Sequence, residues 1–80
     1  MNIDLARQMV RTAFTNGALL QELLSRLKEQ CTNEEYRTLA HGIAEAIDKT
    51  NTSLISPALQ AHPSLDSEIE SSIKSTGSYR

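Results

Sequence analysis

The 80-residue sequence is poor in the residues from which disulfides and aromatic cores are built. It has one cysteine, Cys31, so an intramolecular disulfide is excluded and a reducing compartment is the simplest setting. Tryptophan is absent, and the three aromatic residues are Phe14, Tyr36 and Tyr79. Any core must therefore be mainly aliphatic. A domain of this size buries only about 60 to 65% of the surface that its unfolded chain exposes, which favours stabilisation by oligomerisation.

Clustered positive charge and long apolar runs are also lacking. The formal net charge is −2, and the eight basic residues are scattered, whereas nucleic-acid-binding domains usually carry a basic stripe. No stretch approaches the roughly 20 apolar residues that span a bilayer, and the first residues do not resemble a secretory signal. We therefore expect a cytoplasmic protein that binds neither nucleic acid nor a membrane.

No segment carries a catalytic, cofactor-binding or metal-binding signature. His41 and Glu45 are one helical turn apart and could bring an imidazole and a carboxylate to one metal ion, but zinc sites need three or four ligands. Cys31 lies at the expected C-terminal end of a helix, where the helix dipole disfavours a thiolate. We expect no enzymatic activity, no cofactor, no metal and no small-molecule substrate.

An apolar repeat typical of a long helix fills the first third of the chain. The repeat predicts one helix over residues 3–30 with a coiled-coil-like seam. Asn16 and Gly17 form a turn signal that would split this helix, but the seam passes through Gly17 in register. The seam positions, separated by alternating steps of three and four residues, are Ile3, Ala6, Val10, Ala13, Gly17, Leu20, Leu24, Leu27 and Cys31.

A second helix is predicted over residues 33–55. Thr32 and Glu35 have the spacing of a capping box, which marks its start, and Pro57 sets its outer limit. The connection is so short that this helix must run antiparallel to the first, giving a helical hairpin over residues 1–55. Residues 56–75 are expected to form short helical segments on or near the hairpin, and residues 76–80 a disordered tail.

The apolar face of the first helix is too wide for one neighbouring helix. Either the C-terminal segment folds back to give a three-helix monomer, or two hairpins pair into a four-helix-bundle homodimer. We favour the dimer because Leu65, Ile69 and Ile73 are too few to cover a stripe roughly 40 Å long. The expected core or interface residues are Ala6, Val10, Ala13, Gly17, Leu20, Leu24, Leu27, Tyr36, Ile43 and Ile47.

These features favour an all-α, non-catalytic protein–protein interaction module, such as a small adaptor, inhibitor, immunity factor or secretion chaperone. Besides a second copy, a heterologous protein could contact the outer surface at Leu19, Arg26 and Gln8. One alternative is a small helical regulator that binds nucleic acid through Arg7 and Arg11. A less favoured alternative is a metal-dependent subunit that uses His41 and Glu45.

Overall fold

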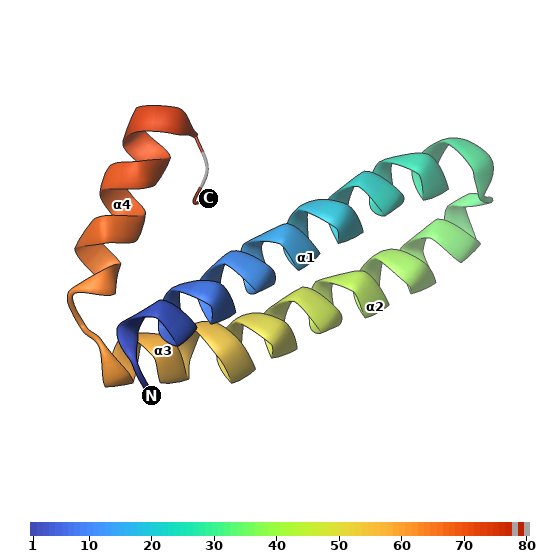
Figure 1. Cartoon of the computed structure of the whole chain (residues 1–80). Coiled ribbons are helices and arrows are strands. Elements are labelled where there is room, and N and C mark those ends of the chain that lie inside the picture. Colours follow the sequence, from blue (N-terminus) through green and yellow to red (C-terminus); the bar gives the residue numbers. More distant parts are fainter. Residues whose placement is uncertain (78, 80) are drawn as a thin grey trace.

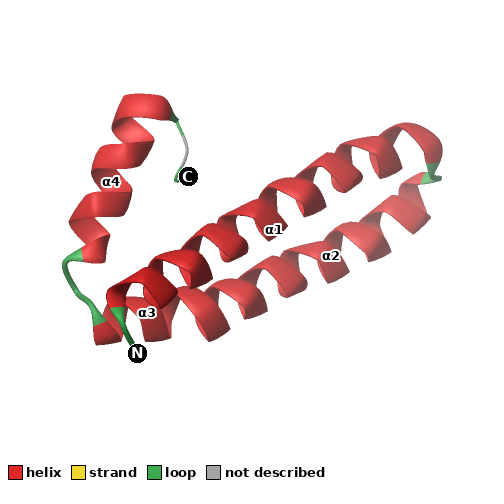
Figure 2. Cartoon of the chain, viewed as in Figure 1, coloured by secondary structure: helices red, strands yellow, loops and turns green. Residues whose placement is uncertain are grey.

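The computed structural model describes residues 1–77 and 79, and this part of the chain is helical with short connections and no strands (Figure 2). The elements are α1 (Ile3–Gln30), α2 (Asn33–Thr50), the π-helix η1 (Asn51–Ile55), α3 (Ser56–Ala61) and α4 (Leu65–Thr76). Helices α1 and α2 run antiparallel as a long hairpin, and α4 rises from its open end (Figure 1). The predicted all-α hairpin is confirmed.

Helix α1 is continuous over 28 residues, so the chain does not break at Asn16 and Gly17. Its start is fixed by Asn2, whose side-chain oxygen accepts a hydrogen bond from the Leu5 backbone N–H at 2.8 Å. A glycine in a helix interior costs only about 1 kcal/mol relative to alanine. Packing along the uninterrupted seam outweighs that local preference for a turn.

Helix α2 begins with the predicted capping box. The Thr32 hydroxyl accepts from the Glu35 N–H at 3.2 Å, and the Glu35 carboxylate accepts from the Thr32 N–H at 3.0 Å. These reciprocal bonds satisfy two backbone donors that the first turn of a helix leaves unpaired. Only Cys31 and Thr32 separate the two helices, which is why the chain reverses direction.

The second arm of the hairpin widens into a π-helix before Pro57. The Ser56 N–H donates to the Asn51 carbonyl five residues earlier. Pro57 has no N–H to donate to a preceding carbonyl, and its ring crowds the preceding turn, so a wider turn relieves both problems. The hydroxyls of Thr50 and Thr52 donate to the carbonyls of Ala46 and Asp48, at 2.8 and 2.7 Å, and such bonds bend helices.

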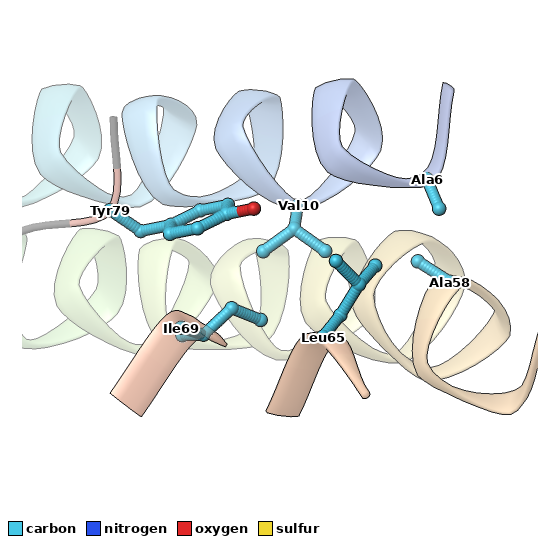
Figure 3. Close-up of a cluster of buried hydrophobic side chains, with 6 residues drawn as sticks. All are labelled: Ala6, Val10, Ala58, Leu65, Ile69 and Tyr79. Carbon is cyan, nitrogen blue, oxygen red and sulfur yellow. The ribbon is translucent and has the colours of Figure 1, made fainter. Parts of the chain in front are cut away.

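The hydrophobic core lies at the open end of the hairpin (Figure 3). Val10 and Leu65 are the largest fully buried side chains, and no residue of α2 is buried. The core therefore joins the first half of α1 to α3, α4 and the C-terminal segment. Its buried residues are Ala6, Val10, Ala58, Leu65, Ile69 and Tyr79.

The structure describes three of the residues expected to form a disordered tail over residues 76–80. Thr76 is the last residue of α4, Gly77 ends that helix with a φ of 80°, and Tyr79 is only 6% exposed. Glycine suits this position because a left-handed backbone is strained for residues with a Cβ. The remaining residues of that prediction, Ser78 and Arg80, lie outside the described part of the chain.

The molecule is long and thin, with principal extents of 44 × 25 × 14 Å. Its radius of gyration is 14.8 Å, whereas a compact chain of this length has one of about 12 Å. The hairpin therefore projects beyond the region that α3 and α4 cover, as Figure 1 shows.

Candidate interaction surface

The predicted seam is fully buried at one end of the hairpin and only partly buried along the rest. Ala6, Val10 and Ala13, all in the first half of α1, are fully buried. The other seven predicted core or interface residues are partly buried, and they are Gly17, Leu20, Leu24, Leu27, Tyr36, Ile43 and Ile47. The hairpin alone therefore covers only part of its own apolar face.

The first turns of α4 pack on the first half of α1 through Leu65 and Ile69. Along its apolar stripe, exposure rises from 0% at Leu65 through 8% at Ile69 to 42% at Ile73. An open groove of about 980 Å³ lies between the middle of α1 and the C-terminal end of α4. We call it the α1–α4 groove. Its lining includes Gly17, Ala18, Ile47, Asn51, Ile73 and Tyr79.

Tyr79 lies at one end of the α1–α4 groove. Its ring meets the Phe14 ring edge to face, with centroids 6.2 Å apart, and the Arg11 guanidinium carbon lies 5.4 Å from the Tyr79 ring centroid. The Tyr79 hydroxyl is buried and has no hydrogen-bond partner among the described residues. Figure 3 shows this hydroxyl pointing along the core towards Val10.

An ion pair fixes α4 to α1 beside the core. The Arg7 Nε donates to both carboxylate oxygens of Glu68, at 3.1 and 3.2 Å, and Arg7 Nη1 lies 3.1 Å from the Asp4 carboxylate. These carboxylates, Glu68 first, raise the pKa of the Arg7 guanidinium above its ordinary value. Arg7 and Arg11 are the two arginines that a nucleic-acid site would use. Arg7 is paired with the Glu68 carboxylate, and Arg11 lies over the Tyr79 ring.

The three residues predicted to contact a heterologous partner are all exposed on α1. Leu19 is 59% exposed, the most exposed large apolar side chain in the described part of the chain. Leu19 lines the α1–α4 groove, whereas Gln8 and Arg26 do not. The structure therefore places Leu19 at the edge of a concave surface and the other two on the open helix surface.

The sequence does not predict the α1–α4 groove, because Tyr79 falls within the expected disordered tail over residues 76–80. The one available signal is an aromatic residue, Tyr79, two positions after a glycine, a residue type that commonly ends helices.

The polar pair that suggested a metal ligand set is an exposed side-chain contact between residues one helical turn apart. His41 Nε2 lies 3.0 Å from Glu45 Oε1, and these side chains are 78% and 71% exposed. Within the described residues, no group of three or more histidine, cysteine, aspartate or glutamate side chains could hold a metal ion. Cys31 is a partly buried free thiol.

No helix in residues 1–77 and 79 combines the length and the apolar character that crossing a membrane requires.

Comparison of the chain with models of protein families, with curated proteins and with solved structures found no match. The geometry of the hairpin and of the α1–α4 groove therefore carries the functional conclusion.

Proposed function

We propose that this protein is a non-catalytic protein–protein interaction module that acts through the apolar faces of its hairpin. The observation that carries the proposal is the incompletely covered apolar face of the hairpin: seven of the ten expected core or interface residues are only partly buried, and α2 has no buried residue. Apolar surface that one chain leaves uncovered is typical of an interface. The single cysteine suits a reducing compartment, so we propose the cytoplasm as its location.

The first partner that we propose is a second copy, which would complete a four-helix-bundle homodimer. The accessible surface of the chain is 5776 Å², whereas a compact monomer of 8.8 kDa exposes about 4,800 Å². The excess, roughly 1,000 Å², compares with the approximately 800 Å² that each partner buries in an interface of standard size. One copy of the same hairpin is large enough to cover it.

Concentration-dependent unfolding tests self-association. If folding is coupled to pairing, dilution destabilises the protein by mass action, and we expect the thermal midpoint to fall by about 3 °C or more per tenfold dilution. The measurement is circular dichroism at 222 nm over a hundredfold range of concentration. A midpoint that does not move over that range argues for a monomer and rejects the homodimer.

A matched pair of variants places the interface on the seam. Leu24 lies on the partly buried part of the seam, whereas its neighbour Ser25 is exposed. Leu24→Glu and Ser25→Glu therefore add the same charge to the same helical turn but on different sides of the helix. We expect Leu24→Glu to abolish the concentration dependence and Ser25→Glu to leave it intact. Equal effects of the two substitutions would place the contact elsewhere.

The second partner that we propose is a heterologous protein that contacts Leu19. A leucine that is 59% exposed at the rim of a groove is a suitable apolar anchor. Affinity capture from the native host, with the wild type and with Leu19→Glu in parallel, tests this contact. Loss of a captured protein with the variant supports the proposal, and identical recovery at equal level contradicts it.

A further inference from the structure

We infer that the side chain of Tyr79 is a reversible plug, which closes the end of the α1–α4 groove beside the core and opens it when the ring moves out. The plug is indicated by the course of the chain after α4, by the contacts of the Tyr79 ring and by its buried hydroxyl. These features lie within one chain, so the plug requires neither of the proposed partners.

The chain moves away from α1 along the last turns of α4 and returns to it at Tyr79. Exposure rises to 42% at Ile73 and falls again to 6% at Tyr79. Between them, Gly77 ends α4 in the left-handed conformation, with a φ of 80°, and such a cap changes the direction of the chain. Tyr79 therefore anchors the segment after α4 against α1.

The Tyr79 ring lies where the groove meets the core. It lines the groove, and it also belongs to the buried cluster that contains Val10 and Ile69 (Figure 3). Its partners on α1 are the Phe14 ring, edge to face, and the Arg11 guanidinium. Contacts of these kinds recognise an aromatic ring rather than a hydroxyl. When the ring leaves, the groove extends to the apolar surface of the core.

The Tyr79 hydroxyl opposes the closed position. It is buried without a hydrogen-bond partner among the described residues. In the open position water solvates this hydroxyl, so closing must remove it from water without a replacement bond. Burial of the ring favours closing and burial of the hydroxyl opposes it. These opposed contributions bring the open and closed states closer in free energy.

The first turns of α4 are held on α1 independently of the plug. Leu65 and Ile69 belong to the buried core, and the Arg7 Nε lies 3.1 Å from the Glu68 carboxylate. All these contacts come from turns of α4 that precede Ile73. Opening therefore uncovers an apolar pocket between α1 and α4, and α4 stays in place.

Binding of toluene, an apolar ring similar in size to the plug, tests this mechanism. Dry apolar cavities in proteins bind small aromatic molecules. Tyr79→Ala removes the plug, whereas Tyr79→Phe keeps the ring and removes the group that opposes closing. We expect toluene to bind Tyr79→Ala most tightly and the wild type next. Tyr79→Phe should bind it about fivefold more weakly than the wild type, or weaker still, because its pocket is open less often.

The measurement is a toluene titration followed by the methyl NMR signals of Ile69 and Ile73. Tyr36→Ala is the matched control, because Tyr36 is a partly buried tyrosine that does not line the groove. We expect this variant to bind toluene like the wild type. A wild type that binds no toluene, or that binds it no more tightly than Tyr79→Phe, would overturn the reversible plug. That comparison decides the matter even if circular dichroism shows Tyr79→Ala to be unfolded.

Discussion

Leu65→Ala is the substitution that tests most severely where the core lies. Leu65 is fully buried and packs in the cluster that contains Val10 and Ala58, so it joins α4 to α1 and α3. Truncating a fully buried leucine to alanine costs about 2 to 5 kcal/mol. A chain of this length has a free energy of unfolding of about 4 to 12 kcal/mol. The substitution therefore removes a large part of the stability.

We expect the thermal midpoint of Leu65→Ala to fall by more than about 10 °C, since 1 kcal/mol shifts the midpoint of such a domain by about 4 to 8 °C. Circular dichroism at 222 nm, with urea titrations for the free energy, gives both quantities. Leu24→Ala is the control, because Leu24 is only partly buried in the single chain. At submicromolar concentration, Leu24→Ala should lower the free energy of unfolding by clearly less than Leu65→Ala does. Equal losses, or a loss at Leu65 of a few tenths of a kcal/mol, would refute the assignment of the core.

Three further predictions concern single residues. Thr32→Ala removes half of the capping box and should lower the free energy of unfolding by about 1 kcal/mol in urea titrations, whereas Thr38→Ala on the exposed surface should not. The hydrogen bond from the Thr32 backbone N–H lowers the pKa of Glu35 in the folded state. The stabilisation of the fold by ionised Glu35 is therefore full above the ordinary glutamate range and fades as the pH falls below about 4.5. Glu35→Gln should flatten the dependence of the free energy of unfolding on pH in that acid range. An unchanged dependence would show that Glu35 does not cause the loss of stability at low pH. Tyr79→Phe keeps the buried ring and removes the unpaired hydroxyl, so the thermal midpoint should stay the same or rise. Tyr79→Ala removes the ring and should lower the midpoint. A marked fall of the midpoint with Tyr79→Phe would mean that the hydroxyl forms a hydrogen bond.

The hairpin could be predicted from the sequence because its signals are local. Thr32 and Glu35 lie three residues apart, and their reciprocal bonds form whatever the rest of the chain does. The continuity of α1 through Gly17 also followed from a periodic pattern that a single unfavourable residue does not cancel.

The position of the core could not be predicted in the same way. Val10 and Leu24 occupy equivalent seam positions, but the placement of α3 and α4 buries Val10 fully and leaves Leu24 only partly buried. That placement depends on contacts such as the Arg7 to Glu68 ion pair, which joins residues 61 positions apart. The return of Tyr79 to the core likewise follows from tertiary packing on Phe14.

The π-helix shows an intermediate case. The sequence predicts that the second helix ends at residue 55, with Pro57 as its outer limit. The chain instead stays helical through η1 into α3. A wider turn accommodates the missing N–H of Pro57 without ending the helix.

The mass of the wild-type protein in solution is the most direct test of the interface. Light scattering after size exclusion, at micromolar concentration, should give twice the 8.8 kDa of one chain. A mass of one chain at that concentration, with the helical signal intact, would contradict self-association through the partly buried seam.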